Sequence, residues 1–268
     1  MYIAGAIAAV MGLSKFSQKY YYQYVPDAKP LTAITSTTAK GPLQVISFNL
    51  HIKNTETFSI VEYLKNSLEP DMPHIIFTPE VTTTAAEELE VLKEFLPHSL
   101  VLPSDSIDGM AFFTDLEPIE LKEVKMDFLD SRAIVGVFNF NGEEILVIAV
   151  HPPAPLSERQ FLARNEYFKN IRAIMSQGKR PTLVIGDFNS TPWSDHFKNL
   201  LKPKLGGGSL PELIDPGEKF ARPFTWFSPI PRLGLPIDFI LHSLEFKVLR
   251  YEIGPRLGSD HRPVIAFF

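Results

Sequence analysis

The chain has 268 residues, of which 45% are hydrophobic and 21% are charged, a balance typical of a globular protein with a sizeable core. It contains no cysteine, which excludes thiol catalysis, zinc sites built from thiolates and a disulfide framework. The formal net charge of -5 argues against a strongly basic nucleic-acid binder, although a metal ion and a few basic side chains could still bind phosphate in one cleft.

The chain begins with an apolar segment, residues 1–25. Its first part is rich in Ala and Gly, and Lys15, Lys19 and several tyrosines follow. The apolar run is short for a membrane-spanning helix, and it lacks the positively charged start of a secretory signal. Three interpretations therefore stay open: a membrane anchor, an atypical export signal, or a helix packed on the domain.

A linker and a single catalytic domain are predicted after this segment. Residues 26–42 combine Pro, Thr, Ser, Ala and Gly without periodicity, which is typical of a linker, so we expect the folded domain to occupy residues 43–268. Hydrophobic periodicity predicts strands that alternate with helices in this domain. The predicted strands are residues 43–48, 74–78, 110–114, 133–140, 144–150, 182–185, 237–242 and 263–268. The predicted helices are residues 57–67, 84–95 and 157–176.

The connections between these elements indicate the fold class. Asn141-Gly142 separates two strands and is a strong signal for a two-residue β-hairpin turn. Other consecutive strands are separated by a helix, as in a parallel crossover unit. Hairpins mixed with crossover helices favour an α/β sandwich over a purely parallel, doubly wound sheet.

Polar side chains follow the predicted strands. In LVIGDFNS, residues 183–190, a buried strand and a glycine turn lead to Asp187 and Asn189. Residues two positions apart in an extended segment point to the same face, so this carboxylate and this carboxamide project together. Such a pair could hold a hard metal ion, which prefers oxygen ligands, and a water molecule beside a phosphate. Each further polar strand end has an ordinary explanation alone, as a turn or surface residue, but together they predict one site: Asn49, Glu80, His151, Asp238, Asp260 and His261.

This order of polar strand ends resembles the endonuclease/exonuclease/phosphatase superfamily, which includes DNase I-like nucleases, sphingomyelinases and inositol-polyphosphate 5-phosphatases. The resemblance covers residues 43–268 and is carried by GDFN at 186–189 and GSDHRPV at 258–264. It implies a DNase I-like, four-layer α-β-β-α sandwich with two packed mixed sheets. One departure is that Thr-Pro precedes Glu80 where members usually have Leu-Gln. Further segments make the chain similar to bacterial membrane-associated members: NLHIKN at 49–54, HPP at 151–153, RN at 164–165, TW at 225–226 and PID at 236–238.

The resemblance implies hydrolysis of a phosphate ester by in-line attack of water, with Mg²⁺ or Mn²⁺ as the cofactor. Glu80 is then the main metal ligand, and Asn49 and Asp260 help directly or through water. Magnesium keeps several waters and takes few protein carboxylates, so a sparse site is expected. Asn49, Asn189 and His151 are the residues expected to bind the phosphate.

Two candidates for the general base stay open. In the first, His261 activates the water while Asp238 fixes its tautomer. In the second, Asp187 takes this role. His151 is expected either to donate to a phosphate oxygen or to protonate the leaving group, with Asp108 as a candidate to orient it. The catalytic set implied by the resemblance is His151, Asp187, Asn189, Asp238 and His261.

The substrate is open at this stage. A nuclease acting on DNA is the first expectation, with Lys53, Arg132 and Arg159 as candidate phosphate contacts, although no basic stripe is present. A hydrolase of a lipid or small phosphoester is the alternative, because the aromatic residues of 220–235 would suit a membrane interface unless they pack as a lid. A noncatalytic binding module on the same fold is the second alternative.

The expected partners follow from these alternatives. One is a phosphodiester substrate, with nucleic acid named first. Another is a membrane contacted through residues 1–25, because the similar bacterial members often carry apolar segments before the catalytic domain. A membrane-associated or exported location is therefore favoured over a cytoplasmic one, and a monomer is expected.

Overall fold

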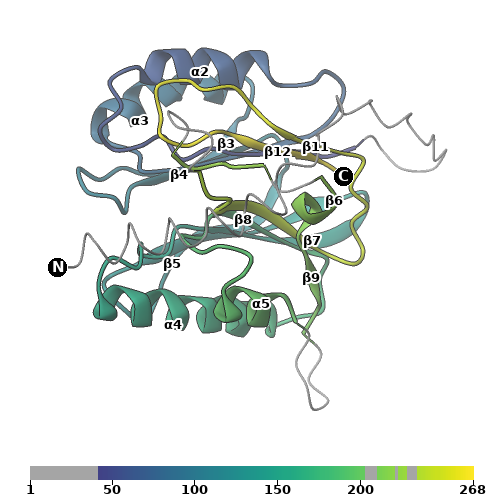
Figure 1. Cartoon of the computed structure of the whole chain (residues 1–268). Helices are drawn as coiled ribbons and strands as arrows, with labels where there is room; N and C mark the ends of the chain where they lie inside the picture. The colour runs from purple at the N-terminus through teal and green to yellow at the C-terminus, as the bar shows by residue number, and fades with distance from the viewer. Residues whose placement is uncertain (1–41, 203–209, 221–222, 228–233) are drawn as a thin grey trace.

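Two mixed sheets form the centre of the molecule. The computed structural model describes residues 42–202, 210–220, 223–227 and 234–268, and within them two six-stranded sheets form (Figure 1). The strands are β1 (Gln44–Ser47), β2 (His74–Pro79), β3 (His98–Leu102), β4 (Met110–Thr114), β5 (Pro118–Lys125), β6 (Arg132–Phe140), β7 (Glu143–Val150), β8 (Thr182–Asp187), β9 (Leu213–Ile214), β10 (Asp238–Ser243), β11 (Arg250–Ile253) and β12 (Val264–Phe267). Their orders are β11-β12-β1-β2-β4-β3 and β5-β6-β7-β8-β10-β9.

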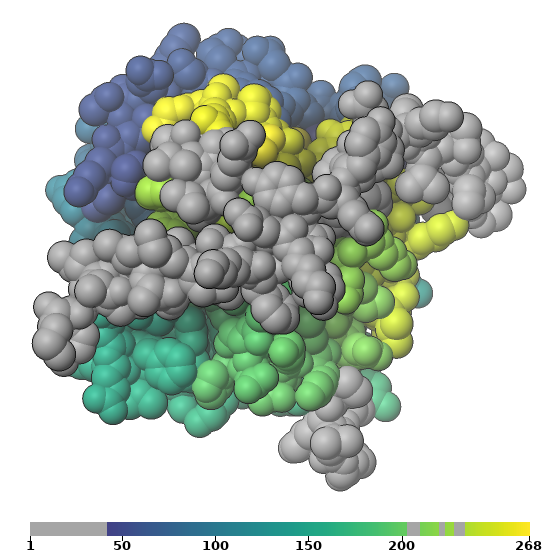
Figure 2. All heavy atoms as spheres, in the orientation of Figure 1, coloured from purple at the N-terminus to yellow at the C-terminus, as the bar shows by residue number. Residues whose placement is uncertain are grey.

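Helices cover the outer face of each sheet. They are α2 (Thr57–Asn66), α3 (Thr83–Leu89), α4 (Glu158–Met175) and α5 (Asp195–Leu201), with the 3-10 helix η1 (Glu90–Glu94). A second 3-10 helix, η2 (Pro216–Phe220), instead contacts β10 of one sheet and β11 of the other. Helices α2 and α3 lie on the first sheet, and α4 and α5 lie on the second sheet (Figure 1). Figure 2 shows these layers as purple and blue atoms above and teal and green atoms below. The predicted four-layer α-β-β-α sandwich with two packed mixed sheets is confirmed.

The core has three parts because each sheet is buried on both faces. One apolar cluster lies between the sheets and includes Val45, Ile75 and Ile185. The neighbouring residues Ile46 and Ile76 point the other way, into a cluster beneath α2 and α3. A third cluster lies beneath α4 and α5. Strands buried on both faces read as continuous apolar runs, which is why the sequences of β7 and β8 lack alternation.

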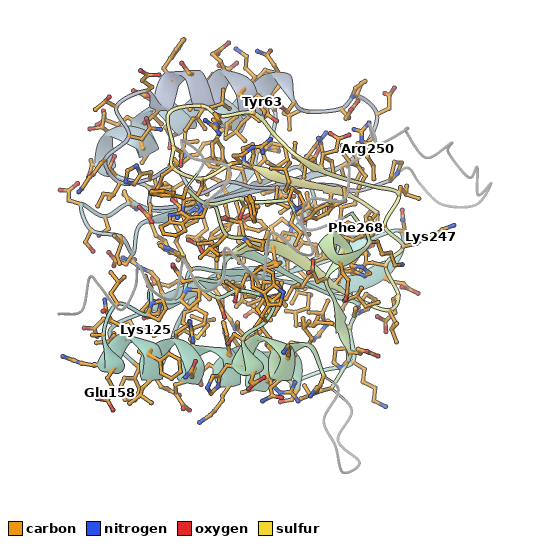
Figure 3. All side chains as sticks on the ribbon, in the orientation of Figure 1. Tyr63, Lys125, Glu158, Lys247, Arg250 and Phe268 are labelled. Atoms are coloured by element: carbon orange, nitrogen blue, oxygen red, sulfur yellow. The ribbon has the colours of Figure 1, made fainter. Side chains whose placement is uncertain are left out.

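Two crossover units set the position of the site. Strands β1 and β2 are parallel with α2 between them, and β7 and β8 are parallel with α4 between them. The carboxyl ends of all four strands therefore lie at one edge of the sandwich. Lys125 and Glu158 lie at this edge, whereas Arg250 and Phe268 lie at the opposite one (Figure 3).

The structure contains elements that the periodicity did not predict: β3, β5, β9, β11 and α5. The four strands are the edge strands of the two sheets, and α5 has only seven residues. Strand β5 also has only half-buried and exposed residues. Weak burial gives a weak hydrophobic pattern, so such strands escape a sequence-based assignment. The helix predicted over residues 84–95 is divided into α3 and η1, and Thr82 caps α3 by accepting a hydrogen bond from the Ala85 N–H at 3.1 Å.

Some predictions lie outside the described residues. They include the apolar segment 1–25, all but the last residue of the linker 26–42, and parts of the aromatic segment 220–235. Among the residues that are described, no helix is long and apolar enough to cross a membrane.

Candidate active site

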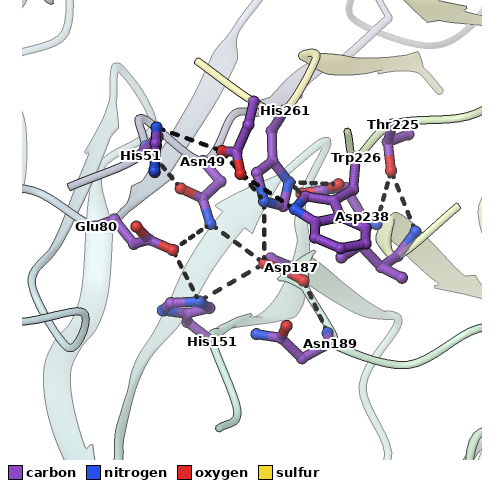
Figure 4. A network of polar contacts seen from close by, with 12 residues as sticks. Asn49, His51, Glu80, His151, Asp187, Asn189, Thr225, Trp226, Asp238 and His261 are labelled. Carbon is purple, nitrogen blue, oxygen red and sulfur yellow. Dashed lines mark hydrogen bonds and ion pairs between the residues drawn. The ribbon is translucent and has the colours of Figure 1, made fainter. Parts of the chain in front are cut away.

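Polar side chains from both sheets meet where the parallel strands end (Figure 4). Asn49 follows β1, Glu80 follows β2, His151 follows β7 and Asp187 ends β8. The Asn49 Nδ2 donates to Glu80 Oε1 at 2.9 Å and to Asp187 Oδ2 at 3.2 Å. The His151 Nε2 lies 3.7 Å from Glu80 Oε1 and 3.6 Å from Asp187 Oδ2. Four residues predicted separately from the sequence thus form one cluster.

Glu80 is held as an ionised carboxylate. Its Oε2 accepts a hydrogen bond from the Ile52 N–H at 2.8 Å, and its Oε1 accepts the one from Asn49. Burial alone would raise its pKa, but His151, Asn49 and Ile52 together outweigh burial and hold the pKa of Glu80 below its ordinary value. The site therefore contains a negative charge at neutral pH.

The departure at Thr78-Pro79 does not remove Glu80 from the cluster. Pro79 is the last residue of β2, and its carbonyl accepts a hydrogen bond from the Leu50 N–H at 3.1 Å. Glu80 then takes a φ of 61°, and Asn189 and His51 have φ values of 46° and 64°. Positive φ is costly for residues other than glycine, and such conformations cluster at functional sites.

His261 and Asp238 form a buried pair beside this cluster. The His261 Nδ1 lies 3.0 and 2.9 Å from the two oxygens of Asp238, and its Nε2 lies 3.7 Å from Asp187 Oδ2. Burial alone would lower the pKa of His261, but the carboxylates of Asp238 and Asp187 raise this pKa to about 10. Burial and the neighbouring Asp238 raise the pKa of Asp187 to about 6, against the opposing effect of the histidines. The geometry thus points a cationic Nε2–H donor toward Asp187.

Asn189 is positioned by its own turn and by helix α4. Its N–H donates to Asp187 Oδ1 at 2.8 Å, and its Nδ2 donates to the Pro152 carbonyl at 3.0 Å. The Arg164 Nη1 donates to the Asn189 carbonyl at 3.0 Å. The Arg164-Asn165 part of the resemblance therefore has a structural reason, because Arg164 ties α4 to the loop that carries Asn189.

Several supporting residues had no predicted role, although Ser259 and Thr225 lie in segments that carry the resemblance. The Ser259 Oγ donates to the Asn49 carbonyl at 2.7 Å and accepts from the His261 N–H at 3.0 Å. The Thr225 Oγ1 accepts from the Asp238 N–H at 3.1 Å. The Tyr167 hydroxyl donates to the Arg132 carbonyl at 2.7 Å. Hydroxyl groups in a loop or on a helix carry no signal of such a role in the sequence, since their partners are distant in the chain.

Asp108 and Arg132 require a correction. Asp108 was a candidate to orient His151, and Arg132 a candidate phosphate contact. Instead, the Arg132 Nη2 lies 2.6 Å from Asp108 Oδ2, and its Nη1 lies 3.5 Å from Glu123 Oε1. Burial alone would raise the pKa of Asp108, but hydrogen bonds from Ser104, Ser106 and Arg132 hold this pKa well below its ordinary value. The oxygens of Asp108 are engaged by these donors, and the guanidinium of Arg132 is engaged by carboxylates.

The comparisons with known proteins agree with this geometry. The model of the Endonuclease/Exonuclease/phosphatase family matches residues 46–261. The chain belongs to this family. Its members are phosphoester hydrolases, so the protein is an enzyme of that class. A search of curated proteins finds no significant match.

Solved structures show the same fold at low identity. An endonuclease/exonuclease/phosphatase from Bacteroides vulgatus is 19% identical with a TM-score of 0.67, covering 85% of this chain and 98% of that one. D. rerio TDP2 complexed with a single-strand DNA product is 14% identical with a TM-score of 0.67, covering 84% and 98%. Sphingomyelinase C from Streptomyces griseocarneus is 14% identical with a TM-score of 0.60, covering 84% and 99%. These neighbours share the fold and differ in the substrates their names imply.

Enzymes with this fold generally use divalent metals, and the donor set at the site suits one. Among the described residues, the buried Oδ1 of Asp260 has no hydrogen-bond partner, while its Oδ2 accepts from the Trp226 Nε1 at 3.2 Å. The His51 Nδ1 lies 3.6 Å and the His261 Nε2 lies 4.0 Å from this Oδ1. A buried carboxylate oxygen without a partner is costly, and a cation or its water would satisfy it. Asp260 and the ionised Glu80 therefore fit a hard cation.

Two other groups fit the metal less well. The ligand atoms of Asp187, Asp238 and His261 lie within 4.8 Å of one another, close enough for one ion. Both oxygens of Asp238 are, however, engaged by His261 Nδ1, so we interpret Asp238 as the residue that orients His261 and not as a metal ligand. Asn49 turns its Nδ2 to the carboxylates while its Oδ1 accepts from the His51 N–H at 2.8 Å. This orientation favours the predicted phosphate-binding role of Asn49 over its predicted role as a ligand.

Proposed function

We propose that the protein hydrolyses a phosphodiester by in-line attack of water, with Mg²⁺ or Mn²⁺ held by Glu80 and Asp260. The observation that carries this proposal is the convergence of Asn49, His151 and His261 donors on the carboxylate of Asp187 at one edge of the sandwich (Figure 4). The bound cation would neutralise charge on the phosphoryl oxygens.

The donors would bind the phosphate. The Asn49 Nδ2, the His151 Nε2 and the His261 Nε2 lie within 3.2 to 3.7 Å of Asp187 Oδ2, so they face one small volume. N–H groups fixed around a site of developing negative charge stabilise a phosphoryl transition state without reorganising. Asp238 would keep the Nε2 of His261 protonated and oriented.

Asp187 is the better of the two candidate bases. The raised pKa of His261 keeps its ring protonated, whereas the pKa of about 6 leaves Asp187 largely ionised at neutral pH. The Asn189 N–H fixes its carboxylate. The water oxygen would bond to phosphorus as its proton passes to Asp187, and the bond to the leaving oxygen would break as His151 supplies a proton to that oxygen.

The substrate class needs its own support. The sequence favours a nucleic acid, and D. rerio TDP2, which shares the fold, is named in complex with a single-strand DNA product. The basic residues give less support, since Arg132 is engaged by Asp108 and Glu123. An amphiphilic phosphoester is the second candidate, because exposed apolar side chains gather near the site.

A substrate panel with and without EDTA tests the proposal. The panel comprises supercoiled plasmid, single-stranded DNA, RNA, sphingomyelin, phosphoinositides and bis(p-nitrophenyl) phosphate. We expect hydrolysis that EDTA abolishes and that added Mg²⁺ or Mn²⁺ restores. Hydrolysis that persists in EDTA would contradict the metal requirement. No hydrolysis with either metal would favour a noncatalytic binding module.

A further inference from the structure

A pocket of about 320 Å³ lies directly beside the catalytic cluster. His151 forms part of its wall, and the Nε2 of the same residue lies 3.6 Å from Asp187. The loop before β4, the loop before β6 and the segment after β7 supply most of the rest, together with Met110 of β4, Arg132 of β6 and Gln160 of α4. A substituent of a phosphate bound at the cluster can therefore enter this pocket, whose volume is at the lower end of the range for small-molecule sites.

The wall of the pocket is largely apolar. Two of its members show the range of burial: Met110 is fully buried, and Ile107 is 47% exposed at the rim. Apolar surface of this kind gains free energy when it leaves water in contact with another apolar group. The apolar lining residues are Ile107, Met110, Leu129, Pro152 and Pro153.

The charges on the wall disfavour an anion. Among the described lining residues, Arg132 is the only lysine or arginine, and it faces the carboxylates of Asp108 and Glu123. Asp130 adds a further negative charge, so Arg132, Asp108 and Asp130 together carry a net charge of -1. A second phosphate in the pocket would meet the carboxylates of Asp108 and Asp130 and no lysine or arginine free of a carboxylate, which is unfavourable at short range. The remaining basic group on the wall, His151, is committed to the scissile phosphate and its leaving group in the proposed mechanism.

The surface around the pocket has the same character. Eleven large apolar residues are exposed among those that the structure describes, and seven of them lie at the edge that carries the site. The other four are Phe95, Ile119, Leu244 and Leu249. Exposed apolar side chains are therefore concentrated at the edge of the sandwich that carries the pocket, and Ile107 joins the two. The seven residues are Phe58, Ile107, Phe128, Leu156, Phe161, Leu162 and Trp193.

We infer that this pocket binds an uncharged, apolar substituent of the scissile phosphate, so the substrate is an amphiphilic phosphodiester and not a polyanion such as a nucleic acid. The inference rests on the proposed phosphodiester hydrolysis and adds the substrate class. It depends on three observations: the shared wall at His151, the engaged Arg132 and the apolar rim.

Two matched esters test the inference. Octyl p-nitrophenyl phosphate carries a neutral chain, and its partner carries a phosphate at the end of the same chain. We expect kcat/KM, measured by p-nitrophenol release with Mg²⁺ or Mn²⁺, to favour the ester with the uncharged chain by about tenfold or more, the discrimination that one or two buried methylene groups provide. Equal values, or a preference for the phosphate-ended ester, would overturn the inference.

A variant at the rim ties that preference to the pocket. Ile107→Lys places a cation on the wall and should reduce the preference several-fold, mainly by improving turnover of the phosphate-ended ester. Ile119→Lys is the matched control, since Ile119 is 57% exposed on β5 at the opposite edge. The inference fails if both variants change the preference equally or if neither does.

The outcomes separate the inference from the proposed function. Metal-dependent hydrolysis of plasmid or of the phosphate-ended ester, without preference for the ester with the uncharged chain, retains the proposed function and overturns the inference. Failure to hydrolyse either ester or any substrate in the panel overturns both. Release of head groups from sphingomyelin vesicles, with DNA left intact, supports both and identifies a lipid as the source of the apolar group.

Discussion

At the scale of single residues, Asp187 connects the two halves of the site. It belongs to the second sheet, yet it contacts Asn49 from the first sheet and lies near both histidines. It is 1% exposed, and burial together with Asp238 raises its pKa. A buried carboxylate surrounded by donors is placed to accept a proton during the reaction.

The change Asp187→Asn tests this role. The amide keeps the size of the side chain and removes the base, so we expect the metal-dependent turnover to fall by about 10² to 10⁴-fold. Asp195→Asn is the control, because the Asp195 side chain is 92% exposed at the start of α5. Circular dichroism and thermal melting should show that both variants are folded. Near-normal turnover by folded Asp187→Asn would contradict the assignment.

Asp108 predicts a dependence of stability on pH. Its folded pKa lies below the unfolded value, so its contribution to stability is present above the unfolded pKa of about 4 and is lost as the pH falls through the folded pKa. We expect Asp108→Asn to lower the urea midpoint at pH 7. The difference from the unmodified protein should shrink as the pH falls below about 4. A difference that stays constant with pH would exclude the charge of Asp108 as its cause.

At the scale of elements, the parallel pair β7 and β8 places two site residues side by side. Val150 pairs with Gly186, so His151 and Asp187 follow at the same level of the sheet. Gly186 has a φ of 141°, and a Cβ there would lie 2.0 Å from the Val150 carbonyl oxygen. The glycine is therefore required by the close approach of the two strands.

Gly186→Ala should separate β7 from β8. We expect a severe loss of stability, seen as a large drop in melting temperature or in soluble yield, because a backbone atom cannot yield to the new methyl group. Gly142→Ala is the matched control: Gly142 has a φ of 86° but nothing within 4 Å of its Cβ position. That change should cost only about 1 kcal/mol for backbone strain. Equal effects would refute the steric explanation.

At the scale of the whole molecule, the sandwich brings together residues from both ends of the domain. Ser259 donates to the Asn49 carbonyl although 210 positions separate them, and β12 pairs with β1. Figure 2 shows the yellow C-terminal residues against the purple and blue part of the chain. The site therefore requires the complete domain, and partial unfolding of either end should abolish activity.

Membrane attachment is a separate proposal for the whole chain. Residues 1–25 are apolar and tyrosine-rich, and the bacterial proteins that the sequence resembles often carry such segments. We expect the full chain to sediment with membranes and to be released by detergent, but not by salt. A chain lacking residues 1–25 should remain in the supernatant with its turnover of soluble esters unchanged. Sedimentation of the two chains in equal amounts would exclude this segment as the anchor.

The sequence by itself determined the type and order of the buried elements and named the polar residues that the fold brings together at one edge. Strands such as β8 are buried on both faces and read as apolar runs. The GDFN segment stands at the end of β8, and the GSDH segment stands shortly before β12, so both could be located from these runs. Half-buried strands such as β5 were missed because weak burial leaves little periodicity.

Only the tertiary structure decided which polar groups are engaged. The ion pairs of Arg132 are an example, because its partners Asp108 and Glu123 lie in other segments of the chain. Sequence spacing therefore could not predict these pairs. The same holds for Ser259 and Asn49, and for the pocket beside His151. Local patterns record burial, because burial acts on each residue of an element. Contacts between loops depend on how the two sheets pack, and that packing is a property of the whole chain.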